Sequence, residues 1–79
     1  MTTLRVRGEV DLTTREAFEN LLRTDDRDLT IDLHDLRFID AAGLRALARA
    51  SHRHELRLLR PSSHLRRLLT LVGLDHLVS

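Results

Sequence analysis

Two aspartates, Asp11 and Asp40, are the residues whose type and position in the sequence best suit a chemical role. Each follows an apolar run that reads as a strand, and each precedes a helical pattern. Two neighbouring carboxylates can act as a general acid and a general base. Asp40 also has a simpler role, because an aspartate before a helix accepts hydrogen bonds from the free amides of the first turn. We therefore expect a capped helix start, which favours negative charge, in preference to a catalytic pair.

The residues after Asp40 define the surface of that helix start. Ala41 and Ala42 carry no hydroxyl, so this position cannot receive a phosphate on a side chain. Gly43 lies in the first turn, and without a Cβ it is expected to let another molecule approach the backbone closely.

The remaining reactive residue types form no recognisable site. The sequence has five histidines and no cysteine. Only His52 and His54 are close, and residues two apart do not share a helical face. We find no glycine-rich phosphate loop, no P-loop lysine and no nucleophile elbow. The sequence therefore predicts no enzyme, no metal site and no cofactor, and it gives the histidines a surface role.

The first half of the chain predicts short strands around one helix. One or two short strands, interrupted near Gly8, use the apolar residues Leu4, Val6, Val10 and Leu12. Thr13 and Glu16 match a capping box, with Thr13 as N-cap, for a helix that ends near Arg23. The helical spacing predicts one apolar face made of Ala17, Phe18, Leu21 and Leu22.

Residues 29–33 alternate in polarity as a strand does, with Leu29, Ile31 and Leu33 on the apolar face. Asp32 lies on the other face, where we expect it to be solvated or paired with an arginine. Leu36, Phe38 and Ile39 carry the chain on to Asp40, and the second helix is expected over residues 41–51. Its apolar stripe is Leu44, Leu47 and Ala48, and another side carries Arg45, Arg49 and Arg53.

The last third adds a strand at Leu56, Leu58 and Leu59, then a third helix capped by Ser62 or Ser63. Gly73 is expected to end that helix, and residues 75–79 to begin an extended segment. The inner face of the helix is predicted to be Leu65, Leu68, Leu69 and Val72. The alternation of strands and helices predicts an α/β fold with a small open mixed sheet and right-handed crossovers, which brings Asp11 and Asp40 to one rim.

Composition limits the choice of function. A chain of 79 residues predicts one small, marginally stable domain, and the lack of cysteine fits a reducing compartment. No segment resembles a membrane span or signal peptide, so we expect a cytoplasmic protein. Residues 1–40 carry ten acids and six arginines, whereas residues 41–79 carry two acids and seven arginines. This division indicates either a charged partner or two solvated faces, and the scarcity of aromatics argues against nucleic acid.

Three segments together resemble the STAS domain, a family named after sulphate transporters and anti-sigma factor antagonists. The central segment is Leu29-Thr30-Ile31-Asp32-Leu33, a spacer and then Phe38-Ile39-Asp40-x-x-Gly43-Leu44. Upstream lies Gly8-Glu9-Val10-Asp11-Leu12. Downstream, Leu65-Arg66-Arg67-Leu68-Leu69 precedes Gly73-Leu74. The resemblance implies a single STAS-like domain over residues 1–79, shortened at both ends, with a first strand that is missing or very short and no final strand and helix.

The resemblance also implies a non-enzymatic module of a bacterial cell that binds an anti-sigma factor of the serine-kinase type and so regulates transcription. Regulated members carry a serine or threonine directly after the signature aspartate, and Ala41 occupies that position here. The usual phosphorylation switch would then be missing. The implied partner surface is Asp11, Thr13, Thr14, Asp40, Ala41, Ala42, Gly43, Leu44 and Arg45, with Arg49 at its edge.

Two alternatives remain open at the level of sequence. STAS-like domains also serve as accessory subunits that grip a transport ATPase, and the chain could equally derive from a larger sensor. Short, poorly covered sheet edges also suggest a homodimer.

Overall fold

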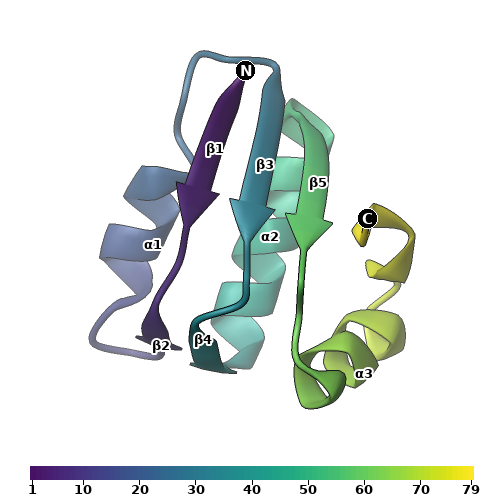
Figure 1. The fold of residues 1–79 in the computed structure, drawn as a ribbon. Helices are drawn as coiled ribbons and strands as arrows, with labels where there is room; N and C mark the ends of the chain where they lie inside the picture. Colours follow the sequence, from purple (N-terminus) through teal and green to yellow (C-terminus); the bar gives the residue numbers. More distant parts are fainter.

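Five short strands, three α-helices and one 3-10 turn make up the computed structural model, which describes residues 1–79 (Figure 1). In chain order they are β1 (Thr2–Arg5), β2 (Gly8–Val10), α1 (Arg15–Leu21), β3 (Asp28–Asp32), β4 (Leu36–Ile39), α2 (Ala41–Arg53), β5 (Glu55–Leu59), α3 (Ser63–Leu71) and η1 (Asp75–Leu77). The α/β class expected from the sequence is confirmed.

The strands form a three-stranded ladder in the order β1-β3-β5 and a two-stranded ladder of β2 and β4. Every pairing is parallel, so the named strands contain none of the antiparallel pairs of a mixed sheet. β2 continues the path of β1, and β4 continues that of β3 (Figure 1). Gly8, with φ +75°, stands at the break. Hydrogen bonds from Val6 N to Asp32 O and from Gly8 N to Asp35 O span the gap.

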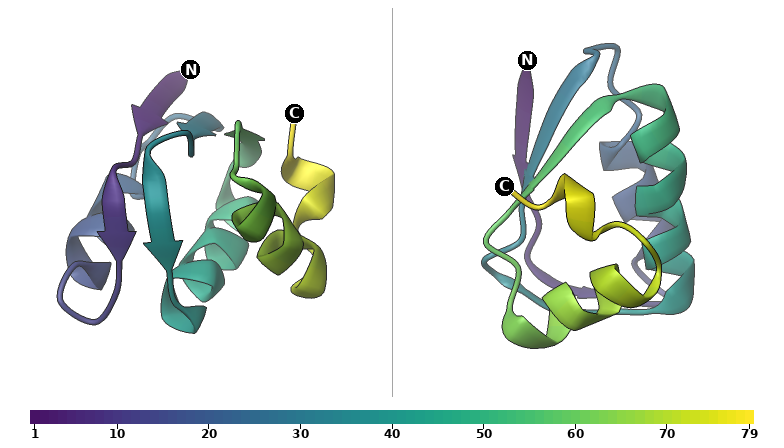
Figure 2. Two further views of the ribbon diagram at one scale, coloured as in Figure 1. Left: turned by 60° about the horizontal axis from the view of Figure 1, so that its bottom comes forward. Right: turned by 90° about the vertical axis from the view of Figure 1, so that its right-hand side faces the viewer.

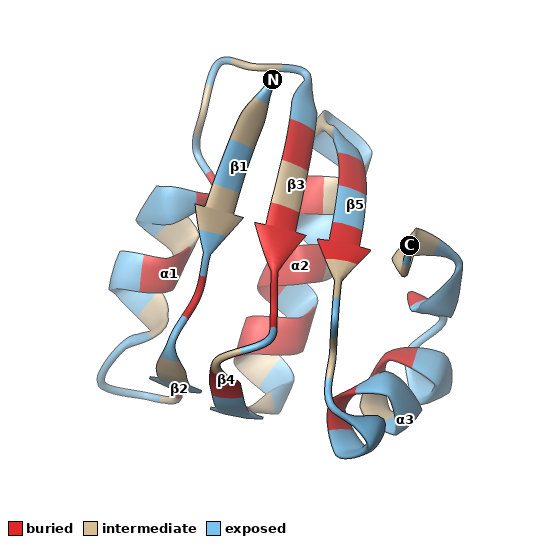
Figure 3. Cartoon of the chain, in the orientation of Figure 1, coloured by how far each residue is buried: buried red, intermediate tan, exposed pale blue.

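The apolar core lies between the sheet and the two helices α1 and α2, which cover one of its faces (Figure 2). Leu29, Ile31 and Leu33 are completely buried, as the alternation predicted (Figure 3). Leu47 and Ala50 of α2 are equally buried and belong to the same core. The helical stripe predicted for α2 is confirmed, with Ala46 and Ala50 as further members and Ala48 only half-buried.

Asp32 lies on the opposite face of the sheet and is nevertheless buried, with 7% of its surface exposed. Arg60 Nη2 donates to Asp32 Oδ2 at 2.6 Å, and the amide of His34 donates to Oδ1 at 3.0 Å. Arg5 Nη2 lies 3.5 Å from Oδ2. The hydrogen bond from Arg60, more than any other contact, lowers the pKa of Asp32 to about 2. Pairing with an arginine, one of the two expectations, is therefore what the structure shows.

The start of α1 differs from the prediction. Thr14 is the N-cap residue and its side chain makes no capping hydrogen bond, so the predicted capping box at Thr13 is wrong. The carboxylate of Asp11 accepts the amides of Thr13 and Thr14 instead. The helix ends at Leu21, and only Phe18 and Leu22 of the predicted apolar face are buried.

The C-terminal third is held by local caps. Ser62 Oγ accepts the amide of Leu65 at 3.1 Å and so starts α3. At the other end, Gly73 N donates to Thr70 O and Leu74 N donates to Leu69 O, which is the Schellman arrangement, with Gly73 at φ +77°. Gly73 is therefore the helix terminator that the sequence predicted.

The first sheet edge follows one of the two expectations, and the segment near the other edge differs from its prediction. A four-residue strand, β1, precedes Gly8, so the first strand is short but present. The segment after Gly73 is mainly the 3-10 turn η1, and its extended part is limited to Val78, which pairs with Leu58 of β5. One edge of the three-stranded ladder is thus partly covered, while β1 pairs only with β3.

Candidate functional site

Asp11 and Asp40 lie at the same rim of the sheet, as predicted, because β2 and β4 are parallel neighbours. Val10 pairs with Ile39, and Asp40 N donates to Val10 O at 3.0 Å. Each aspartate is therefore the first residue after its strand. Figure 1 shows both strands ending at the edge where α1 and α2 begin. We call this edge the rim: Asp11, Thr13, Thr14 and residues 40–45.

Asp11 organises its own turn. Its Oδ1 accepts the hydroxyl of Thr13 at 2.8 Å and the amide of Thr13 at 3.0 Å. These bonds, followed by those from Thr14, lower the pKa of the Asp11 carboxyl. Thr14 Oγ1 in turn accepts the amide of Asp11 and donates to Glu9 O at 2.8 Å. A carboxylate held ionised by four local donors is suited to electrostatic contact and poorly suited to receive a proton in catalysis.

Asp40 caps α2 as predicted. Its backbone is extended, and Oδ1 accepts the amide of Gly43 at 2.8 Å. Asp40 is half-buried, whereas the next residue, Ala41, is exposed. The methyl group of Ala41 is thus presented to solvent at the positive end of a helix.

Gly43 does not do what the sequence suggested. It is buried, and a Cβ there would lie 2.6 Å from Ile39 Cγ1 and 2.8 Å from Val10 Cγ1. The backbone of α2 therefore needs glycine because β2 and β4 press against it, and no outside molecule reaches this position. The expectation of a close approach by another molecule is wrong for this structure.

The other predicted residues divide by exposure. Thr13, Thr14, Arg45 and Arg49 are exposed, Ala42 is half-buried, and Leu44 is buried. Arg49 Nη2 lies 3.2 Å from Glu19 Oε1 and so links α2 to α1. Leu44, like Gly43, is buried and helps to position the helix.

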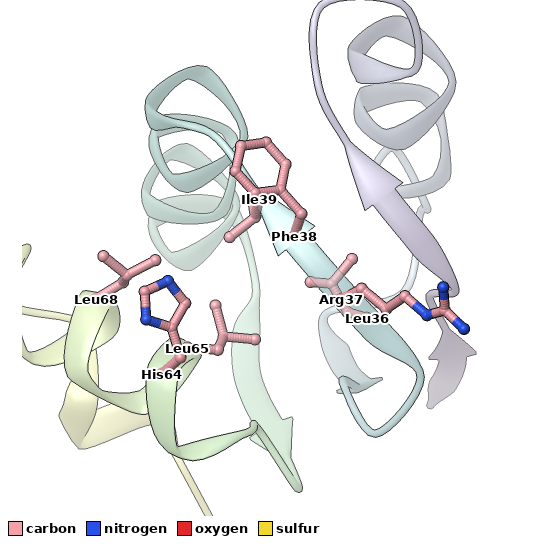
Figure 4. A pocket seen from close by; sticks show the side chains of 7 residues that line it. All are labelled: Leu36, Arg37, Phe38, Ile39, His64, Leu65 and Leu68. Carbon is pink, nitrogen blue, oxygen red and sulfur yellow. The ribbon is translucent and has the colours of Figure 1, made fainter.

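Sequence reasoning missed several exposed apolar residues. Leu12 is 77% exposed in the turn between Asp11 and Thr13, although it was assigned to a strand. Phe38, at 48%, stands beside the rim. Figure 4 shows Phe38 and Ile39 facing His64, Leu65 and Leu68 of α3 across a small pocket. Its free space of about 10 Å³ holds about one water molecule, so it is no ligand site. Residues two apart in a strand share a face, so the pattern places Phe38 with the buried Leu36 and gives no sign that Phe38 is exposed.

Two further findings concern whole classes of site. No group of three or more histidine, aspartate or glutamate side chains is placed to hold a metal ion. None of the helices has the length and apolar character needed to cross a bilayer.

Comparison with known proteins identifies the family. A search of the curated proteins gave no match. Among solved structures, the chain is similar to the anti-sigma factor antagonist SpoIIAA in its unphosphorylated form, with a TM-score of 0.83 and 20% sequence identity. That alignment covers 98% of this chain and 77% of the SpoIIAA chain. The family model described as "Mlab, STAS domain" matches residues 1–79. The chain therefore belongs to this STAS domain family, and it shares the fold of SpoIIAA.

Proposed function

We propose that this chain is a non-enzymatic, cytoplasmic interaction module that binds a serine-kinase-type anti-sigma factor through the rim. The observation that carries the proposal is the parallel pairing of β2 with β4, which sets the ionised Asp11 next to the capped start of α2. The likeness to SpoIIAA, an anti-sigma factor antagonist, supports this choice of partner class.

The rim offers a partner a mixed surface. Thr13, Ala41 and Arg45 are exposed on it, with Leu12 as an apolar contact. Arginine is enriched in protein interfaces, and the exposed Leu12 adds apolar surface that a partner can cover.

The proposal includes a missing switch. Ala41 and Ala42 have no hydroxyl, and the hydroxyls nearest in the rim already have partners. Thr13 Oγ1 donates to Asp11, and Thr14 Oγ1 donates to the carbonyl of Glu9. A phosphate on either would break the turn that starts α1. Binding is therefore not reversed by phosphorylation at this rim.

The test is a binding titration of the wild type and Ala41→Glu against the anti-sigma factor kinase of the same host. A carboxylate at position 41 is tolerated by the helix start but adds negative charge beside Asp11 and Asp40, so affinity for an acidic partner surface should fall about tenfold or more. The matched control is His52→Glu, which adds the same side chain roughly 16 Å along the same helix at 1.5 Å per residue and should bind like the wild type.

A kinase assay completes the test. Wild-type protein should remain unphosphorylated, and Ala41→Ser should create an acceptor. Equal affinity for the wild type and Ala41→Glu would place the contact surface elsewhere. Phosphate found on Thr13 or Thr14 of the wild type would mean that the switch has moved.

A second candidate keeps the rim and changes the partner to the ATPase of a transport complex. The observation that favours it is the matched family description, which names a STAS domain without naming anti-sigma factor antagonists. Binding of an ATPase that is lost in Ala41→Glu, with no binding of an anti-sigma factor kinase, would select it.

A further inference from the structure

The outer edge of the sheet, formed by β1 and β2, has no strand beside it. β1 pairs only with β3, and β2 pairs only with β4. Val6 N and Gly8 N donate inward, to carbonyls at the end of β3 and just after it. Because the backbone groups of successive residues in a strand point to opposite sides, Arg5 and Arg7 direct theirs outward. Neither N nor O of Arg7 has a backbone partner, and such groups can pair with an added strand.

A groove lies directly beside this edge, between the strands and α1. Its volume is about 300 Å³, and its strand wall lies within residues 5–10. Its other wall consists of four residues with i, i+3, i+4, i+7 spacing, which share one face of a helix: Thr14, Ala17, Phe18 and Leu21. Ala17 is exposed, and Leu21 is 49% exposed. The groove shares only Thr14 with the rim, so it is a separate, partly apolar surface.

The position of α1 limits what can pair with the edge. Figure 1 shows α1 on the outer side of β1 and behind the plane of the sheet. Paired strands lie about 4.8 Å apart, whereas a helix is about 10 Å wide. If a second copy paired its own β1 with this edge, its α1 would enter the same layer and collide with the first. A single extended segment lies beside β1 and over α1 without this conflict, and one strand of a partner therefore fits best.

The charges along the edge define the other side of that strand. Alternation places the side chains of Arg5 and Arg7 on the face of the sheet away from α1, because Val6 between them is buried. Arg7 makes no ion pair, and Arg5 lies 3.5 Å from Asp32. Acidic side chains opposite these arginines form favourable cross-strand pairs. Glu9 carries the opposite charge, so the match to acidic residues covers β1 and ends before β2.

We propose that the β1 edge binds an extended segment of a partner protein as an additional strand. Its apolar side chains enter the groove against Ala17 and Leu21, and its acidic side chains face Arg5 and Arg7. In this mode of recognition, main-chain hydrogen bonds supply affinity, and the space for alternate side chains supplies specificity. The edge lies beyond the surface of the proposed function and does not depend on which protein binds the rim.

The experiment uses the full chain, isotope-labelled, and a designed peptide of about seven residues, which spans roughly 23 Å as a strand at 3.3 Å per residue. Valine and glutamate alternate along the peptide. Amide chemical shifts of the protein report the binding site, and their titration gives the dissociation constant. We expect the shifts to lie in residues 3–9 and 14–21. A peptide of the same composition, with its valines grouped together and its glutamates grouped together, tests whether the alternation matters.

Methylation of the peptide backbone tests the main-chain hydrogen bonds directly. Alternate N–H groups of a strand point to opposite sides, so either the valine amides or the glutamate amides face β1. N-methylation of that set should weaken binding about tenfold or more, because each methyl group removes a donor. N-methylation of the other set should leave the affinity near that of the unmodified peptide. The two methylated peptides are thus matched controls for each other.

Leu21→Ser should weaken binding about tenfold, because it removes the exposed apolar contact at the end of α1. Its matched control is Leu71→Ser at the end of α3, which removes the same exposed side chain and should change affinity less than about twofold. Arg7→Glu should also weaken binding and reduce its dependence on salt, with Arg66→Glu as the control. If Leu21→Ser fails to fold, Ala17→Glu is the second variant, because it places a charge in the groove at an exposed helical position.

Strand addition is refuted if the peptide does not bind, if the peptide with grouped residues binds equally well, or if both methylated peptides behave alike. Equal losses in Leu21→Ser and Leu71→Ser would also refute it, as would chemical shift changes confined to the rim. Self-association that rises with concentration and is abolished by Ala17→Glu would assign the edge to a second copy and so contradict the proposal. None of these outcomes affects the Ala41→Glu test against an anti-sigma factor kinase.

Discussion

Gly43→Ala is the sharpest test of how the rim is built. In the wild type, Gly43 donates its amide to Asp40 Oδ1 and packs its Cα against β2 and β4. An added Cβ would lie 2.6 Å from Ile39 Cγ1 and 2.8 Å from Val10 Cγ1, well inside the ordinary carbon contact of about 3.5–4.0 Å. Both side chains are buried, at 4% and 2% exposure, so neither can turn aside into solvent.

Two opposing effects set the magnitude. Replacing glycine by alanine within a helix stabilises it by up to about 1 kcal/mol. Overfilling a packed core by a methyl group costs about 1–3 kcal/mol. Two simultaneous clashes with branched, buried side chains place the cost in the upper half of that range. We expect a net destabilisation of about 1–2 kcal/mol, which for a domain of this size lowers the melting temperature by roughly 4–16 °C.

The chain has no tryptophan or tyrosine, so unfolding by urea is best followed by far-ultraviolet circular dichroism. Ala41→Gly is the control for helix propensity alone, because Ala41 lies in the same helix, two residues from Gly43, and is exposed. Combining Gly43→Ala with Val10→Ala removes one clash, and a coupling of about 0.5 kcal/mol or more is expected between them. Gly43→Ala with wild-type stability or better, or strict additivity with Val10→Ala, would refute the packing argument.

Two further predictions concern charged side chains. Asp40→Ala should cost on the order of 1 kcal/mol while Asp40→Asn stays near the wild type, since asparagine also caps helices; equal stability of all three would remove the cap assignment. The pKa of Asp32 in the folded chain, about 2, lies below the ordinary aspartate value of 3.8, so the folded state holds fewer protons on this group. The stability it contributes is present above about pH 4 and is lost as the pH falls towards 2. The melting temperature, measured at several pH values across this window, should therefore depend less on pH for Asp32→Asn than for the wild type. An identical dependence on pH in the two proteins would contradict the pairing with Arg60.

The parts of the structure that rest on local patterns were predictable from the sequence. The alternation of Leu29, Ile31 and Leu33 predicted a buried strand, and all three are completely buried. The cap of Asp40 is also local, because a side chain needs only to reach an amide three residues ahead. To predict that Asp11 and Asp40 lie close together, one further rule was needed, namely that parallel strands end at a common edge of the sheet.

The parts that failed depend on contacts between distant segments or on competition between close ones. Gly43 meets Val10, more than thirty residues earlier, so no local pattern shows that its missing Cβ is filled by the core. At the start of α1, Thr13 fits the capping pattern. The carboxylate of Asp11 is a stronger hydrogen-bond acceptor, however, and it accepts the amides of Thr13 and Thr14. Helical spacing placed Val72 on the inner face, yet α3 ends at Leu71 and leaves Val72 half exposed.

The charge division seen along the sequence acquires a spatial meaning in the fold. The acidic half supplies Asp11 and Asp40 at the rim, and the basic half supplies Arg45 of the rim and the remaining arginines of α2 and α3. A partner that covers the rim must place its acidic groups over Arg45 and keep them away from Asp11. Negative charge introduced at Ala41 would extend the acidic side of the rim towards Arg45. The same substitution would therefore oppose any acidic group of a partner that lies over Arg45, which is the only arginine of the rim.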